Sequence, residues 1–191
     1  AIAYSEFEEA VQEFSATELR SGKGAANMKS SGNSFLDGSV DFDNDLCDVN
    51  GANDLGLTCY NGNFEPSQAT PYYFSIGAVN SDGKHTSYST AGANVLVSAP
   101  AGEYGDFEPA MVTTDQMTCL RGYSSFTRAD RFDNSYFPGF FAGFYPFNNP
   151  GHPENASCNY TSTFNGTSSA APNASGVVAL IASANPELSY R

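Results

Sequence analysis

The feature that most constrains this chain is an apolar segment near its C-terminus, residues 167–185, with a proline early in it. Apolar side chains recur there every three or four residues, which predicts a helix buried on one face. Asn185-Pro186 predicts where the helix ends. Pro172 suits the first turn of a helix, where a backbone N–H has no helical partner to lose. The sequence therefore places Ser168 at or just before the helix N-terminus. The recurring apolar positions are Ala171, Ala174, Val178 and Ile181.

A serine hydroxyl in that position has two interpretations. Free N–H groups and the positive end of the helix dipole lie beside it, so an oxyanion formed by attack of Ser168 on a carbonyl would be stabilised there. This favours nucleophilic acyl transfer. The alternative is that Ser168 only caps the helix. A nucleophile elbow of the α/β-hydrolase type is excluded, because it requires Gly-x-Ser-x-Gly and Ala170 takes the place of the last glycine.

The N-terminal region predicts a helix followed by a strand. Ser5 is suited to be the N-cap and Glu8 completes a capping box, while Gly22 is a natural stop. A helix, a short Gly-Lys-Gly loop and a strand make half of a parallel β/α unit, so the sequence predicts an α/β fold. An apolar stripe at helical spacing comprises Phe7, Val11 and Phe14, and the predicted strands are residues 25–30, 72–79, 94–100 and 110–114.

Length and charge limit the function further. The 191 residues suffice for one domain with a sizeable core. A formal charge of −13 argues against nucleic-acid partners and anionic membrane surfaces, both of which need basic patches. No apolar run approaches the roughly 18 residues that would span a bilayer. The composition indicates a soluble protein that meets cationic substrates or metal ions.

Four cysteines form an even set without a Cys-x-x-Cys pair, so disulfides in an oxidising compartment are a better interpretation than a metal site. Three pairings are open, and four reduced thiols are the alternative. We favour Cys47–Cys59 and Cys119–Cys158, because each pair closes a loop-rich segment. These segments belong to two irregular stretches, about 34–70 and 119–160, which we expect to be loop insertions.

Three segments together resemble the subtilisin-like serine peptidases (subtilases). The segment "NGTSSAAPNASGVVALI" is similar to their nucleophile helix, and "KSSGN" to the strand that ends at the oxyanion hole. Between these two, "FSIGAVNSDGKHTSYSTAGANVLVSAPAGE" follows the family's order of strand, turn, S-x-S-x-x-G and Ala-Pro. The segments "AMVTTD" and "NPELSYR" resemble more narrowly the kexin or proprotein-convertase branch. The resemblance implies the three-layer subtilisin-like fold, a mainly parallel sheet flanked by helices.

The resemblance also implies roles for individual residues. Ser168 matches the nucleophile and Asn33 the side-chain donor to the oxyanion. Ser30, Ser31 and Gly32 match the strand that lines the pocket for the residue before the scissile bond. The two distant motifs are therefore expected to meet across the substrate carbonyl.

The family's other catalytic residues are missing. Its aspartate lies in Asp-Ser/Thr-Gly and its histidine in His-Gly-Thr, and neither motif precedes Asn33. His85 and His152 have neither the neighbours nor the place in the order that a general base would need. We expect residues 1–191 to be the C-terminal part of one catalytic domain, inactive alone, whose parent chain continues upstream and beyond Arg191. Its partners would be a protein or peptide substrate and the missing N-terminal half.

An acidic loop follows Asn33. Clustered carboxylates repel one another unless a cation is present, and the resemblance implies a structural calcium ion held by Asp37 or Asp41. It also implies that Asp48, beside Cys47, receives a basic substrate side chain. The spacing does not fit an EF-hand, and a solvated acidic loop without a ligand is the alternative. The remaining acidic residues of the loop are Asp43, Asp45 and Asp54.

Two classes of function remain. The first is a secreted or periplasmic serine endopeptidase, kexin-like, with a preference for basic residues. The second is a non-catalytic subtilase-like module that binds peptide or protein. The presence of both Ser168 and Asn33 favours the peptidase.

Overall fold

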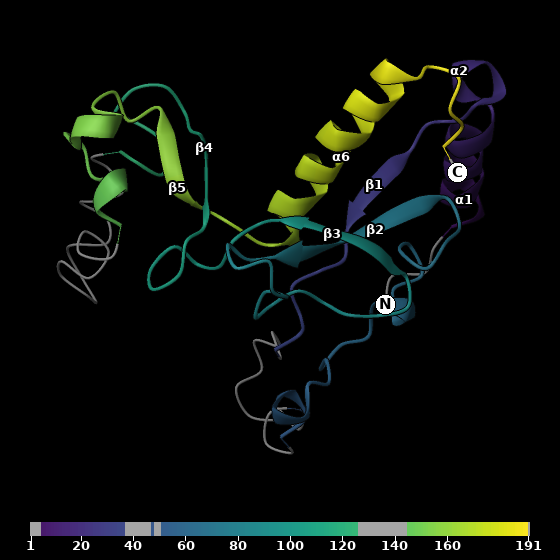
Figure 1. Cartoon of the computed structure of the whole chain (residues 1–191), viewed down its shortest axis with the longest axis horizontal. Helices are drawn as coiled ribbons and strands as arrows, with labels where there is room; N and C mark the ends of the chain where they lie inside the picture. Colours follow the sequence, from purple (N-terminus) through teal and green to yellow (C-terminus); the bar gives the residue numbers. More distant parts are fainter. Residues whose placement is uncertain (1–4, 37–46, 48–50, 126–144, 191) are drawn as a thin grey trace. The chain divides into compact units, whose positions relative to one another are not determined.

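A parallel sheet with the strand order β1-β2-β3 organises the part of the chain that carries Ser168 and Asn33 (Figure 1). Its strands are β1 (Asn27–Ser30), β2 (Tyr73–Val79) and β3 (Val95–Pro100), in the three regions that the sequence predicts. The computed structural model describes residues 5–36, 47, 51–125 and 145–190. These residues belong to two compact units, Ala1–Pro100 with Gly166–Arg191 and Ala101–Asn165.

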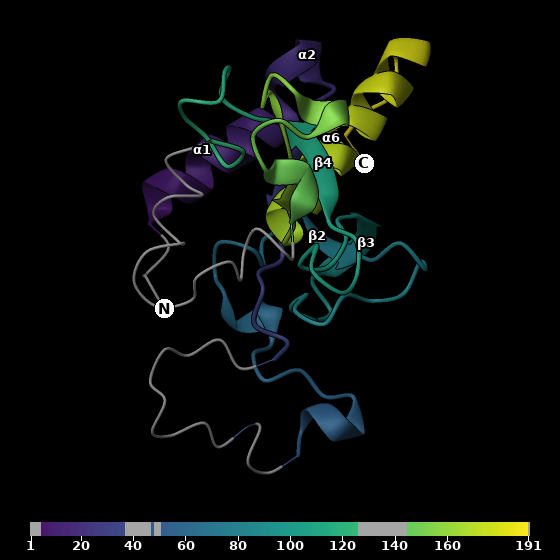
Figure 2. The same ribbon diagram turned by 90° about the vertical axis from the view of Figure 1, so that its left-hand side faces the viewer.

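The long helix α6 (Thr167–Ala184) packs against all three strands of this sheet (Figures 1 and 2). It approaches closely because the residues facing the sheet are small: Ala170 is fully buried and Ala174 is 8% exposed. The middle strand of the sheet is also buried, with Ile76 and Ala78 fully inaccessible to solvent. The α/β fold with a parallel sheet flanked by helices is therefore confirmed.

The helix begins earlier than its proline suggested. Thr167 is the first helical residue and Gly166 the N-cap, so Ser168 lies inside the first turn. Pro172 consequently lies in the second turn, not in the first as predicted. A proline at this position cannot donate to the carbonyl of Ser168 four residues before it. The helix tolerates this loss about one turn after Ser168.

The N-terminal helix α1 (Glu6–Thr17) starts with the predicted capping box. The Glu8 N–H donates to Ser5 Oγ at 3.2 Å, and the Ser5 N–H donates to Glu8 Oε2 at 3.0 Å. The helical segment ends at Gly22, as predicted, but it is interrupted before that residue. In α2 (Leu19–Gly22), Arg20 and Ser21 have the non-helical φ angles 54° and 60°. The apolar stripe of α1 is largely exposed: Phe7 77%, Val11 50% and Phe14 58%.

The second unit contains an antiparallel pair, β4 (Met111–Thr114) and β5 (Tyr160–Phe164), with the single-turn helices η3 (Pro146–Asn148) and η4 (Pro153–Asn155). We predict β4 from the sequence but do not predict β5. The alternating threonines of "YTSTF" are its signal in the sequence. Asn155 ties the unit together, donating to the Tyr160 carbonyl and accepting from the Tyr160 N–H.

Both favoured disulfides, Cys47–Cys59 and Cys119–Cys158, are present. The described parts of the stretch from 34 to 70 contain two short helical turns, η1 (Asn53–Leu55) and η2 (Gly62–Phe64). Within the described residues, no helix has the length and apolar character needed to cross a membrane.

Candidate active site

Asn33 follows the carboxyl end of β1, and Thr90 holds the turn that carries it. The Thr90 N–H donates to the Gly32 carbonyl at 2.9 Å, and Thr90 Oγ1 accepts from the Ser34 N–H at 2.9 Å. Gly32 has φ of 101°, where a Cβ would meet Thr90 Oγ1 at 3.0 Å, so the turn requires glycine. The backbone on both sides of Asn33 is thus fixed by one buried threonine.

The Asn33 side chain is joined directly to the start of α6. Asn33 Oδ1 accepts from the Thr167 N–H at 2.8 Å and from the Thr167 hydroxyl at 3.0 Å. The Thr167 hydroxyl oxygen also accepts from the Gly32 N–H at 3.1 Å. Thr167 is 1% exposed, so these bonds are sheltered from water. The two motifs that the sequence predicted to meet are therefore neighbours, with Thr167 between them.

This arrangement leaves two donors free beside each other. Both hydrogen bonds to the Asn33 amide use its oxygen, and within the described residues its Nδ2 has no hydrogen-bond partner. The Ser168 N–H, in the first turn of α6, likewise has none there. Both Asn33 and Ser168 are exposed. Two free N–H donors beside a serine hydroxyl at a helix N-terminus are the parts of an oxyanion hole.

Gly166 allows the start of α6 to lie close to the Asn33 side chain. It has φ of 80° and ψ of 167°, and a Cβ there would lie 3.0 Å from Asn33 Nδ2. Any other residue would be strained and would displace the amide that the site requires. These two constraints explain why the first position of the Gly-Thr-Ser motif is a glycine.

The predicted substrate-binding residues lie at the same end of β1. Ser30 and Gly32 are half-buried, whereas Ser31 is 2% exposed and its hydroxyl has no hydrogen-bond partner among the described residues. Their proposed contact with substrate stays a prediction. The other predicted ligands, Asp48 for a basic side chain and Asp37 and Asp41 for calcium, lie outside the described residues. Among the described residues, no group of three or more His, Cys, Asp or Glu side chains could hold a metal ion.

Neither histidine is joined to the serine. The exposed His85 ring lies 4.8 Å from the Phe35 ring, centroid to centroid, and the His152 ring lies 5.4 Å from that of Phe147. In the described part of the chain, no hydrogen bond connects Ser168 Oγ to a histidine or carboxylate. Within the described residues, Ser168 therefore lies beside free N–H donors but has no bonded group that could act as its general base.

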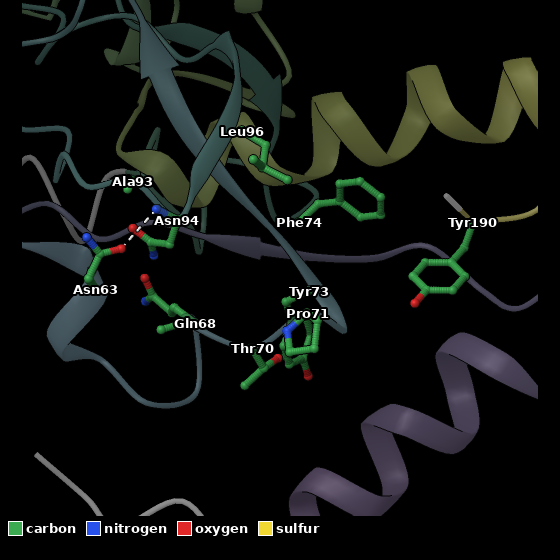
Figure 3. A pocket seen from close by; sticks show the side chains of 11 residues that line it. Asn63, Gln68, Thr70, Pro71, Tyr73, Phe74, Ala93, Asn94, Leu96 and Tyr190 are labelled. Atoms are coloured by element: carbon green, nitrogen blue, oxygen red, sulfur yellow. Dashed lines mark hydrogen bonds between the residues drawn. The ribbon is translucent and has the colours of Figure 1, made fainter.

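A separate cavity of about 680 Å³ lies at the opposite ends of the strands (Figure 3). Its polar side chains, Asn63, Gln68 and Asn94, group at one end, and Phe74 and Leu96 lie at the other. It lies where β2 and β3 begin, whereas Asn33 follows the carboxyl end of a strand parallel to them. This cavity is therefore not part of the Ser168 site.

Sequence reasoning missed Thr167 and Thr90 as parts of the site. Thr167 belongs to the Gly-Thr-Ser motif, which could have pointed to it. Its two hydrogen bonds to Asn33 Oδ1, however, are visible only in the structure. Thr90 had no signal of its own, since a lone threonine in a polar loop is unremarkable in sequence.

The chain is similar to several known proteins. Residues 3–191 match the model of the subtilase family (Peptidase_S8). An extracellular serine protease of Aeromonas sobria is 38% identical over 172 residues, which cover 88% of this chain and 24% of the relative. A microbial serine proteinase of Aeromonas salmonicida is 42% identical over 131 residues, covering 69% of this chain and 19% of the relative.

Two crystal structures of an Aeromonas sobria serine protease are also similar. The protease alone has a TM-score of 0.72 and 32% identity, covering 98% of this chain and 29% of its own. Its complex with a chaperone has a TM-score of 0.70 and 30% identity, covering 98% of this chain and 28% of the solved chain. The chain thus spans about a quarter of the length of the relatives that it matches.

Proposed function

Because the chain belongs to the subtilase family, we propose that it is the C-terminal part of the catalytic domain of a serine endopeptidase. Ser168 would be the nucleophile, and Asn33 would donate its amide to the oxyanion. The observation that carries this proposal is the pair of hydrogen bonds from Thr167 to Asn33 Oδ1, which leave Asn33 Nδ2 and the Ser168 N–H free on adjacent segments. The relatives named above as serine proteases support the same activity.

The chemistry would proceed in two steps. Ser168 Oγ attacks the scissile carbonyl carbon, its proton passes to a histidine, and the carbonyl electrons move onto oxygen. That oxyanion accepts hydrogen bonds from the Ser168 N–H and Asn33 Nδ2. Its collapse expels the amine, which takes the proton from the histidine, and leaves an acyl-enzyme ester on Ser168. Water, deprotonated by the same histidine, then attacks the ester carbonyl, and collapse of this second intermediate releases the acid while the histidine returns its proton to Ser168 Oγ.

The histidine and the aspartate that orients it would come from a preceding segment of the same protein. The small share of each relative that this chain covers supports a longer parent. Exposed apolar side chains support it too, because such surfaces are normally covered. They form the stripe of α1 and the outer side of α6: Phe7, Val11, Phe14, Val177, Leu180 and Ile181.

Substrate preference and calcium form the finer part of the proposal. A kexin-like preference for a basic side chain would use the Asp48 carboxylate, which supplies the complementary charge. Calcium would be held by Asp37 or Asp41, because hard oxygen donors in a crowded acidic loop are the ligands this cation takes. The ion would relieve repulsion among the loop carboxylates and order the chain that follows Asn33.

Secretion is also proposed. Two disulfides persist in oxidising compartments, and one relative is described as extracellular. A peptide or protein substrate would be the principal partner. The chaperone complex belongs to the Aeromonas sobria protease, and a comparable partner for this protein is a proposal.

The test uses the extended protein, meaning the reading frame upstream of Ala1 together with residues 1–191. We expect it to contain His-Gly-Thr and, before that, Asp-Ser/Thr-Gly, and to hydrolyse a peptide p-nitroanilide. Ser168→Ala should abolish turnover. Ser175→Ala is the matched control, because Ser175 lies two turns further along α6 and its hydroxyl only bonds the Ala171 carbonyl. Turnover that survives in Ser168→Ala would contradict the proposal. An extended protein without either motif would instead support the non-catalytic, peptide-binding alternative.

A further inference from the structure

Tyr88 connects the two segments that make the site, although it belongs to neither. It lies between β2 and β3 and is 3% exposed, the one tyrosine in the buried core of the described residues. Its backbone carbonyl accepts from the Phe35 N–H at 3.0 Å, and its phenol oxygen accepts from the Gly166 N–H at 2.9 Å. Phe35 lies two residues after Asn33, and Gly166 lies two residues before Ser168. One buried residue therefore holds both sides of the oxyanion hole.

The support behind Tyr88 is rigid. The Thr86 N–H donates to the Ala78 carbonyl at 3.2 Å, and Ser89 Oγ accepts from the Ala78 N–H at 3.0 Å. Ala78 lies in the middle strand of the sheet and is fully buried. The neighbours of Tyr88 on both sides are thus bonded to one residue of β2. The position of the phenol oxygen is defined relative to the sheet, not only relative to a loop.

Gly166 needs such a restraint more than another residue would. Glycine has no Cβ to limit its backbone angles, so its conformation depends on the bonds that it makes. Thr167 ties the start of α6 to Asn33, but those bonds do not connect Gly166 to the sheet. The Tyr88 phenol supplies that connection. Loss of the hydroxyl would leave the buried Gly166 N–H without this acceptor and free the turn to move.

We infer that Tyr88 is a positioning residue for catalysis: its phenol fixes the Gly166–Ser168 turn against Asn33, so that the Ser168 N–H and Asn33 Nδ2 converge on one oxygen. This inference rests on the proposed function. Tyr88 touches no reacting atom. Its contribution would come from alignment, since donors of an oxyanion hole act only at hydrogen-bond distance from where the charge forms.

The experiment compares Tyr88→Phe with Tyr73→Phe in the extended protein. Tyr88→Phe keeps the ring in the core and removes the hydroxyl, whose oxygen accepts from the Gly166 N–H. We expect kcat to fall between about 10- and 100-fold with KM unchanged, because a displacement of this kind acts on the transition state. Tyr73→Phe should leave both constants as they are, since the half-buried Tyr73 lies at the amino end of β2.

A double-mutant cycle distinguishes alignment from general destabilisation. In an Asn33→Ala background there is no second donor left to align, so Tyr88→Phe should change kcat less than about two-fold. Equal losses of kcat in both backgrounds, or an unchanged kcat in Tyr88→Phe alone, would overturn the inference. Retained turnover in Ser168→Ala would instead overturn the proposed function, so the two failures are distinguishable.

A second variant covers the case in which Tyr88→Phe does not fold. Replacement of Tyr88 by 4-aminophenylalanine keeps a polar group of similar size on the ring, but its ring-conjugated nitrogen is a poor hydrogen-bond acceptor. The inference expects kcat to fall with an unchanged melting temperature. A kcat equal to that of the unmodified protein would contradict it.

Discussion

Thr167 donates two hydrogen bonds to a single atom, the side-chain oxygen of Asn33, from its backbone N–H at 2.8 Å and from its hydroxyl at 3.0 Å. The two residues are 134 positions apart in the chain. Because both donors approach the oxygen, the amide group is held with its NH₂ available. The residue before the proposed nucleophile thereby orients the amide that we propose as the second oxyanion donor.

Thr167→Val should lower kcat of the extended protein by roughly ten-fold, because the hydroxyl that holds Asn33 Oδ1 is lost while the buried volume is kept. Thr167→Ser retains the hydroxyl and should keep most of the activity. Steady-state kinetics on a peptide substrate would measure both variants. Equal activity of the valine and serine variants would show that the backbone N–H alone orients Asn33.

Asn33→Ala should lower kcat by about 10²–10³-fold with little change in KM, because this donor is engaged only when the oxyanion forms. Asn33→Asp tests whether the side chain acts by donating a hydrogen bond. Its carboxylate would face the developing negative charge with no proton to donate. We expect it to be at least as inactive as the alanine variant. A loss confined to KM in either variant would assign Asn33 to ground-state binding.

Local signals in the sequence were sufficient for much of the fold. The capping box at Ser5 and Glu8 and the strands of the parallel sheet each depend on residues near one another, and all are present. The two cysteine pairs are predicted from the loop-rich segments that they close, and both are present. The error at Pro172 has a tertiary cause: Gly166 and Thr167 are bonded to Tyr88 and Asn33, so the helix starts before the point that its proline favours. Neither bond leaves a periodic pattern in the chain.

The two disulfides should contribute unequally to stability. Cys119 and Cys158 are 39 residues apart and Cys47 and Cys59 are 12 apart, and a longer closed loop removes more entropy from the unfolded chain. In the chain-entropy model, the longer loop should contribute about 1 kcal/mol more. Denaturant unfolding of Cys119→Ala/Cys158→Ala and Cys47→Ala/Cys59→Ala would measure the two contributions. A larger contribution from Cys47–Cys59 would show that effects on the native state, not loop length, determine the difference in stability.

Glu187 provides a pH-dependent contact near the C-terminus. The hydrogen bond and positive charge of Lys23, 2.7 Å away, lower the pKa of the Glu187 carboxyl. A group whose pKa falls on folding stabilises the native state above its unfolded pKa, about 4.3, and this contribution is lost as pH falls through the folded pKa. An NMR titration should show the Glu187 pKa rising towards its ordinary value in Lys23→Gln. Lys84→Gln, which affects the exposed pair with Asp82, should leave it unchanged.

Calcium should raise the melting temperature of the extended protein if the acidic loop binds it, because a ligand that binds only the folded state stabilises it by mass action. Chelation by EGTA should reverse the shift. Asp37→Asn combined with Asp41→Asn should remove it, whereas Asp82→Asn, outside that loop, should not. A melting temperature that calcium does not change would favour a solvated loop without a metal.

The backbone of Gly166 has an evolutionary consequence. Every amino acid reachable from a glycine codon by one base change carries a Cβ, which at this position would be strained and would press on Asn33 Nδ2. The first substitution at this position therefore both strains the backbone and shifts the Asn33 amide, with no conservative replacement in between.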